Sequence, residues 1–224
     1  MDVTAHDGEL QARARQSLGS SADEIYRTVA VVLRERGAGG ILADIGCGGG
    51  HLWQHVSAMF AACLGVDAVR YDGLPAEVAF TSADLDRLPL PLADGYADVV
   101  AAVETIEHLE NPRAFCRELT RVAKPGGWIV VTTPNQLSLL SLMTLIVKQR
   151  FSAFQDVAYP AHRTALLEVD LRRIASECSL QDVAVRYTQS GRLPLSASHY
   201  PEWLARRFPR ALSDNVVLIG RKCV

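Results

Sequence analysis

The sequence has no apolar run long enough to cross a membrane. A membrane-spanning helix needs roughly 20 consecutive, mostly apolar residues, and no run in these 224 residues reaches that length. Residues 1–7 are polar and acidic, whereas a secretory signal begins with basic residues and continues with apolar ones. We therefore expect a cytoplasmic protein without a transmembrane segment.

A disulfide framework and a strong net charge are also missing. The cysteines are odd in number and scattered, which is typical of a reducing compartment. They are Cys47, Cys63, Cys116, Cys178 and Cys223. The formal net charge is −2 at pH 7, so nucleic acid is an unexpected partner. The length of 224 residues suits one α/β domain that buries its own core.

Glycine, by contrast, is concentrated in one short segment. Residues 42–50 read Leu-Ala-Asp-Ile-Gly-Cys-Gly-Gly-Gly, and residues 51–56 can form a helix directly afterwards. A strand, a glycine turn and a helix N-terminus form a cradle for a nucleotide-like ligand, because glycine permits positive φ and has no Cβ atom. Asp44 before the turn is a poor neighbour for the pyrophosphate of a dinucleotide but a good one for a cation. S-adenosylmethionine (SAM) carries an ammonium and a sulfonium, so Asp44 favours SAM.

Helix and strand signals alternate along the rest of the chain. Ser21 and Glu24 form the pattern of a capping box, which predicts a helix that begins at residue 22. Asn111 and Pro112 predict a second helix, with Asn111 as its N-cap. Residues 128–133 are a continuous apolar and β-branched run, as expected for a strand covered on both faces. This alternation predicts a mostly parallel sheet whose ligand lies beyond the carboxyl ends of the strands.

Further acids follow the expected strands, and together the motifs carry a family resemblance. The chain resembles the class I SAM-dependent methyltransferases, of the methyltransferase domain 11/23 type, from about residue 25 onward. The matching segments are residues 43–50, 65–67, 83–85, 104–108, 119–127 and 133–135. The resemblance implies a Rossmann-like three-layer α/β sandwich, with a seven-stranded, mostly parallel sheet that ends in an antiparallel C-terminal hairpin.

The resemblance also implies where SAM would bind. Asp44 and the glycines would hold the methionine end, Asp67 the ribose, and Asp84 with Leu85 the edge of the adenine. The full set of expected cofactor-binding residues is Asp44, Gly46, Cys47, Gly48, Gly50, Asp67, Ala68, Asp84, Leu85 and Val103.

The segment Glu104-Thr105-Ile106-Glu107-His108 carries the candidate chemistry. If the chain turns helically here, Glu104, Glu107 and His108 project to one side. Such a set can bind Mg²⁺, Mn²⁺ or Zn²⁺, and His162 is a fourth candidate ligand. The pattern is similar to ubiquinone-biosynthesis O-methyltransferases and small-RNA 2′-O-methyltransferases, in which it holds a metal. The alternative is that His108 or His162 acts as a general base without any metal.

The expected domain plan is a single domain over 1–224, with an N-terminal helical cap over 1–37 and a substrate-recognition lid over 135–165. Residues 137–147 predict a helix that is apolar around most of its circumference. An ordinary buried helix is the favoured interpretation, and a lid, a homodimer face or a shallow membrane contact are the alternatives.

Three functions remain open from the sequence. The leading hypothesis is methyl transfer to a hydroxyl of a small-molecule acceptor, such as a metabolite, a quinone-like phenol or a glycan sugar. The second is RNA 2′-O-methylation, which the small net charge disfavours. The third is a non-catalytic SAM-binding protein.

Overall fold

The computed structural model describes residues 19–224, so the first half of the expected N-terminal cap lies outside the described residues. The helices are α2 (Asp23–Glu35), α3 (His51–Val56), α4 (Pro112–Val122), α5 (Leu139–Lys148), α6 (Glu168–Glu177) and α7 (Glu202–Arg207). The strands are β1 (Ile41–Ile45), β2 (Ala62–Asp67), β3 (Ala79–Ser82), β4 (Ala97–Ala102), β5 (Ala123–Pro134), β6 (Gln181–Tyr187) and β7 (Asn215–Arg221). No helix in this part of the chain is long and apolar enough to span a membrane.

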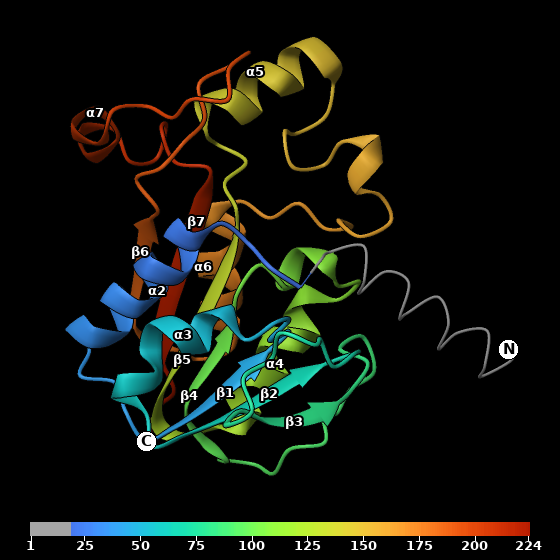
Figure 1. Cartoon of the computed structure of the whole chain (residues 1–224), viewed down its shortest axis with the longest axis vertical. Coiled ribbons are helices and arrows are strands. Elements are labelled where there is room, and N and C mark those ends of the chain that lie inside the picture. Colours follow the sequence, from blue (N-terminus) through green and yellow to red (C-terminus); the bar gives the residue numbers. More distant parts are fainter. Residues whose placement is uncertain (1–18) are drawn as a thin grey trace, which may run out of the picture.

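The strands form one seven-stranded sheet in the order β3-β2-β1-β4-β5-β7-β6 (Figure 1). The first five strands in this order pair in parallel, and β7 runs antiparallel to both of its neighbours, β5 and β6. The predicted fold class, with its antiparallel C-terminal hairpin, is therefore confirmed. All carboxyl ends of the parallel strands lie at one edge, where a ligand of such a sheet binds.

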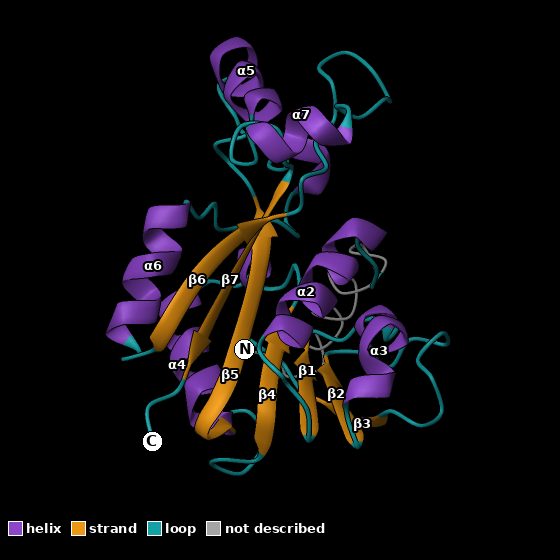
Figure 2. Cartoon of the chain, turned by 90° about the vertical axis from the view of Figure 1, so that its left-hand side faces the viewer, coloured by secondary structure: helices purple, strands orange, loops and turns teal. Residues whose placement is uncertain are grey.

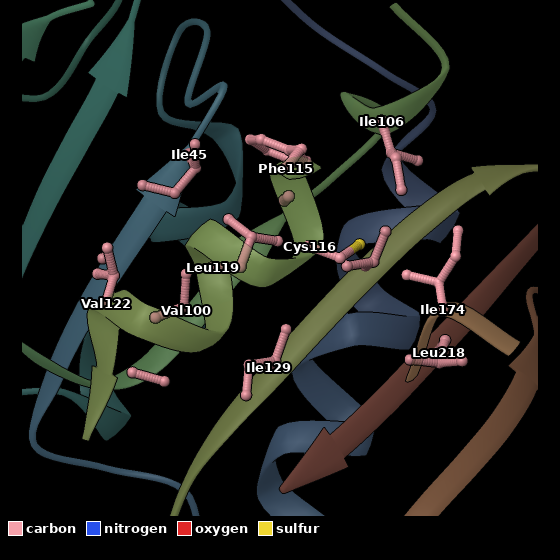
Figure 3. Close-up of a cluster of buried hydrophobic side chains, with 14 of the residues drawn as sticks. Ile45, Val100, Ile106, Phe115, Cys116, Leu119, Val122, Ile129, Ile174 and Leu218 are labelled. Atoms are coloured by element: carbon pink, nitrogen blue, oxygen red, sulfur yellow. The ribbon is translucent and has the colours of Figure 1, made fainter. Parts of the chain in front are cut away.

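Helices cover both faces of the sheet, with α2 and α3 on one face and α4 and α6 on the other (Figure 2). Neighbouring residues of a strand point to opposite faces, so each central strand contributes to two cores. Leu42 and Val99 pack with α2 and α3, whereas Ala43 and Val100 pack with α4 and α6. In the second core, side chains of α4 lie against the sheet (Figure 3), with Phe115 only 1% exposed. This arrangement is the expected three-layer sandwich.

Of the two predicted helix N-termini, the structure confirms one and contradicts the other. Asn111 caps α4 as predicted, because its side chain accepts a hydrogen bond from the Ala114 amide at 3.0 Å. The capping box at Ser21 and Glu24 is wrong. Helix α2 begins at Asp23 with Ala22 as its N-cap and no side-chain cap, and the Ser21 amide donates instead to the Tyr26 hydroxyl at 2.9 Å. This bond turns the segment before α2 toward the candidate site.

Two other expectations need correction. Strand β5 begins at Ala123, directly after α4, because Ala123 already pairs with Ala97 of β4; the expected start was residue 128. Helix α5 is not an ordinary buried helix, since Ser141 is its only buried residue. Helices α5 and α7 both lie beyond the carboxyl ends of the parallel strands (Figures 1 and 2).

Candidate cofactor and acceptor site

The turn after β1 has a shape that only glycine can adopt without strain. Gly46 and Gly48 have φ angles of 79° and 50°, a region that residues with a Cβ atom avoid. A Cβ atom on Gly46 would lie 2.3 Å from the Thr105 hydroxyl, and one on Gly48 would lie 2.2 Å from the Gly19 carbonyl oxygen. The segment before α2 therefore lies directly on the glycine turn. The two segments together form one wall of a cavity.

This cavity, of about 690 Å³, lies at the carboxyl edge of the parallel strands. Nine of the ten expected cofactor residues line it, and only Gly50 does not. Gly50 instead occupies the N-cap position of α3 with a φ of 74°. The four expected metal or catalytic residues also line the cavity. One continuous space thus connects the two sets of residues that the sequence singles out.

Asp44 places a negative charge deep in the cavity wall. The side chain is 3% exposed, and burial, together with the nearby Asp67 carboxylate, raises the pKa of Asp44 to about 7. No cationic side chain among the described residues lowers the pKa of Asp44. A buried carboxylate without a cationic partner is costly in a folded protein. A cationic ligand is therefore the natural complement of this site.

Asp67, at the end of β2, is held in place by backbone amides. Its carboxylate accepts hydrogen bonds from the Gly48 amide at 2.9 Å and the Ala68 amide at 2.7 Å. Burial nevertheless raises the pKa of Asp67 overall. The Val69 amide also donates to this carboxylate. An ionised carboxylate has about four lone-pair sites, so it can still accept from a ligand hydroxyl. This geometry suits the recognition of a ribose diol.

Glu104 is oriented by the protein itself. One carboxylate oxygen accepts from the Thr132 hydroxyl and the other from the Asn215 amide, each at 2.7 Å. The residue has a φ of 48°, which non-glycine residues rarely adopt. Burial raises the pKa of Glu104 to about 7. The expectation that Glu104 joins the other three metal-ligand candidates is corrected, because the group whose ligand atoms lie within 4.8 Å of one another contains Glu107, His108 and His162 but not Glu104.

Glu107, His108 and His162 do come together, with candidate ligand atoms that all lie within 4.8 Å of one another. His108 Nδ1 lies 2.9 Å from the Ala161 carbonyl oxygen, and His162 Nδ1 lies 2.6 Å from that of Ala153. A carbonyl can only accept, so each Nδ1 carries the proton. The lone pair of each neutral ring is therefore on Nε2. Backbone carbonyls thus fix the same tautomer in both histidines.

The carboxylate of this group is deeply buried. Glu107 is 1% exposed, and neither of its side-chain oxygens has a hydrogen bond of normal geometry, although the nearby Thr133 hydroxyl and the Glu107 amide act to lower its pKa. Burial and the Glu104 carboxylate raise the pKa of Glu107 well above its usual range. Burial also lowers the pKa of His162, which favours the neutral ring. A buried carboxylate beside two histidines has the ligand types that could hold a divalent cation.

Comparison with known proteins supports the same interpretation as the glycine turn and the acids of the cavity. Residues 43–131 match a protein family described as "Methyltransferase domain". These residues therefore carry the methyltransferase domain, and the chain is similar there to the class I SAM-dependent methyltransferases. It is 32% identical over 136 residues to the mitochondrial ubiquinone biosynthesis O-methyltransferase of Schizosaccharomyces pombe, a match that covers 53% of this chain and 47% of that protein.

The relatives of the chain differ in the acceptor atom that their names state. The norajmaline N-methyltransferase of Rauvolfia serpentina is 35% identical over 102 residues, which is 40% of this chain and 34% of that protein. The chain thus matches about half or less of each of these two relatives. A SAM-dependent methyltransferase from Archaeoglobus fulgidus shares the fold, with a TM-score of 0.63 and 20% identity over 88% of this chain and 94% of that one.

The residues that line the cavity fit SAM. Asp44 is a buried acid that lacks a cationic partner, and the glycine turn leaves room that a Cβ atom would fill. Burial raises the pKa of Tyr26, and the Asp44 and Glu104 carboxylates raise it further; all three residues line the cavity. A ligand end with two positive charges would be stabilised there.

Several cavity residues carry no recognisable sequence signal. Gly19, Ser20, Ser21 and Tyr26 come from the segment around the start of α2, and Thr188, Ser190, Arg192, His199, Asp214 and Asn215 come from the region around β7. Apart from Ser21, which is part of the capping-box pattern, none of these residues belongs to a motif, and only the fold brings them to the site. Arg192 was one of several scattered arginines in the sequence, and it forms an ion pair with Asp214 at 3.0 Å.

Proposed function

We propose that this methyltransferase transfers the methyl group of SAM to a hydroxyl oxygen of a small-molecule acceptor. The observation that carries the proposal is the pair of histidines of fixed tautomer, His108 and His162, beside the cofactor cradle. Amine acceptors can react as free bases, whereas a hydroxyl must lose its proton. An imidazole that presents Nε2 to the cavity can accept that proton. The O-methyltransferase named among the relatives agrees with this choice.

In the proposed mechanism the protein mainly binds SAM and the acceptor and orients them for the reaction. SAM supplies an electrophilic methyl carbon on a sulfonium sulfur when it is bound. Asp44 would hold the ammonium end, and Asp67 would accept hydrogen bonds from the ribose hydroxyls. His162 Nε2 would take the acceptor proton as the acceptor oxygen bonds to the methyl carbon and the carbon–sulfur bond breaks. Holding the reacting atoms about 3 Å apart and in line supplies much of the acceleration.

The test is formation of S-adenosylhomocysteine from SAM with a phenol, a catechol and a primary amine as acceptors. We expect turnover with a hydroxyl acceptor, and its loss in His162→Asn without loss of S-adenosylhomocysteine binding. His55→Asn is the matched control, because His55 lies outside the cavity lining and pairs with Asp23 at 2.9 Å. Turnover that is confined to the amine, and unchanged in His162→Asn, would refute the proposed acceptor chemistry.

A second candidate mechanism uses a divalent cation. The Glu107 oxygens, which lack a hydrogen bond of normal geometry, favour it, and Glu107, His108 and His162 would hold the ion. A cation there would lower the pKa of the acceptor hydroxyl, and the two histidines would then be ligands rather than bases. Calorimetric titration of chelator-treated protein with Mg²⁺, Mn²⁺ and Zn²⁺ tests this candidate. Binding in the wild type that Glu107→Gln removes supports the metal mechanism, and absence of binding supports the histidine base.

A further inference from the structure

Helix α5 turns an apolar stripe toward solvent. Leu139, Leu142, Met143, Ile146 and Val147 follow the i, i+3, i+4, i+7, i+8 spacing of one helix face. Their exposed fractions are 40%, 37%, 43%, 81% and 78%, respectively. A surface helix of a globular protein normally buries such a face against the core. Among the described residues, nothing covers this stripe.

The opposite side of α5 is polar, and it is the side that the protein buries. The Ser138 hydroxyl caps the helix by accepting from the Ser141 amide at 3.2 Å. The Ser141 hydroxyl is buried; it donates to the Gln136 side chain at 3.4 Å and accepts from the Ser152 amide at 3.2 Å. Because both serines find partners inside, rotating α5 to hide its apolar face would leave buried polar groups unpaired. The outward orientation of the stripe is therefore built into the fold.

Positive charge lies at the C-terminal end of the stripe. Lys148 ends α5 and Arg150 follows two residues later; both are exposed, and residues 139–150 contain no acid. Arg150 also forms an ion pair with the exposed Asp156. Helix α7 lies at the same end of the molecule (Figures 1 and 2). It carries Trp203, which is 71% exposed, and the exposed Arg206 and Arg207. Apolar and aromatic side chains with a basic rim are the composition of helices that bind anionic lipid surfaces.

We propose that α5 lies in the interface of an anionic lipid bilayer, with its apolar stripe inserted among the lipids and Lys148 and Arg150 at the headgroups. The helix has ten residues, which is too short to cross the roughly 30 Å hydrocarbon core. It would lie parallel to the surface instead. A second copy of the chain is the less suitable occupant, because residues 139–150 contain no acid that could pair with the cations of the other copy.

The position of α5 connects the lipid surface to the cavity. Ser152 and Ala153 line the cavity only a few residues after the end of α5, and Ala153 also orients His162. A membrane-bound α5 would therefore hold the acceptor side of the cavity near the headgroups. This placement favours an amphiphilic acceptor with a hydroxylated head and an apolar tail, an inference that rests on the proposed function.

Flotation of the purified protein with lipid vesicles tests the membrane contact without any assay of methyl transfer. The vesicles contain phosphatidylcholine with about a third phosphatidylglycerol, or phosphatidylcholine alone. We expect the wild type to float with the anionic vesicles and to bind the neutral ones less. The double variant Ile146→Glu, Val147→Glu should weaken that partitioning by about tenfold or more, because two carboxylates replace inserted apolar side chains.

Val31→Glu is the matched control, since Val31 is an exposed aliphatic residue of α2, 47% exposed and outside the cavity lining. It should float like the wild type. Retained S-adenosylhomocysteine binding reports that each variant is folded, because neither substitution touches the cavity. Lys148→Glu with Arg150→Glu should abolish the preference for anionic vesicles.

Equal flotation of the double variant and the wild type would overturn the proposal, as would failure of the wild type to float. Analytical ultracentrifugation tests the alternative occupant. If the wild type does not bind vesicles and is a dimer, and the double variant is a monomer, a second copy covers α5 instead. Loss of S-adenosylhomocysteine binding in the wild type would refute the proposed function but leave the flotation result intact. The two failures are therefore distinguishable.

Discussion

Replacing Asp44 by Asn should change protein stability and ligand affinity in opposite directions. Asp44 is buried, and its pKa in the folded chain is about 7, compared with about 4 for an unfolded aspartate. The folded chain therefore binds more protons than the unfolded chain between these values. Stability contributed by the protonated carboxyl is lost as pH rises through this window, and the cost of the ionised form is complete above pH 7.

The magnitude follows from the two pKa values. At about 1.4 kcal/mol for each tenfold change in proton affinity, a pKa of about 7 rather than about 4 costs up to about 4 kcal/mol when Asp44 is ionised. Asn keeps the shape of the side chain and removes the charge, so Asp44→Asn should stabilise the ligand-free protein by about 1–4 kcal/mol at about pH 8.5, and by much less at about pH 5. The upper end assumes that the Asn amide finds partners.

The same substitution should weaken binding of S-adenosylhomocysteine, which keeps the ammonium group of SAM. A hydrogen bond to a charged group contributes about 1.5–3 kcal/mol, so the dissociation constant should rise by about 10- to 150-fold. In the wild type, affinity should improve with rising pH up to about 7, because ligand binding requires the ionised Asp44. The variant should lose this dependence.

Thermal unfolding at the two pH values and calorimetric titration of the ligand measure both effects. A variant that is less stable at the higher pH would contradict the burial of an unpaired charge at Asp44. Unchanged ligand affinity, with no change in its pH dependence, would refute the assignment of Asp44 to the ammonium of the ligand.

Three further substitutions test other parts of the account. Gly48→Ala should abolish ligand binding and lower the melting temperature, because its Cβ atom would lie 2.2 Å from the Gly19 carbonyl oxygen; normal binding in calorimetry would exclude that close approach. Glu107→Gln should stabilise the ligand-free protein above pH 7 by about 1–3 kcal/mol, since burial raises the pKa of Glu107, and it should leave S-adenosylhomocysteine affinity intact; reduced stability in thermal unfolding would indicate a partner for this carboxylate. Ser179→Gly should raise the free energy of unfolding in urea by about 0.5–1 kcal/mol, because Ser179 has a φ of 54° just after α6; an unchanged or lower value would show that its backbone is not strained.

The central sheet was predictable because its signals are local. The apolar runs at β1, β2 and β4, the glycines after β1 and the Asn111 cap are each encoded within a few neighbouring residues. Their order along the chain also matches a known family. The predicted fold was confirmed for these reasons, including the antiparallel strand β7.

The wrong predictions concern residues whose role depends on contacts made only in the folded chain. Ser21 has the sequence of an N-cap, but the Tyr26 hydroxyl accepts from its amide. Glu104 has the spacing of a metal ligand, but Thr132 and Asn215, from β5 and β7, take both of its oxygens. Tyr26 is only five residues from Ser21, but no sequence pattern marks its hydroxyl as the acceptor; the partners of Glu104 lie 28 and 111 residues away from it.

Helix α5 shows a different kind of limit. Its apolar residues have the correct spacing for a buried face, and periodicity alone cannot say whether that face meets the protein or something else. The buried hydrogen bonds of Ser141 decide the orientation. The cavity wall from residues 188–199 is similarly invisible in the sequence, because no motif marks Arg192 or His199 as neighbours of the glycine turn.

Calorimetric titration of the wild-type protein with S-adenosylhomocysteine tests the central claim most directly, because the whole account depends on a SAM site between the glycine turn and the acids of β1 and β2. We predict one site per chain with a dissociation constant on the order of micromolar, and no competition from NAD. Absence of binding, or displacement of the nucleoside by NAD, would contradict the assignment of this cavity to SAM.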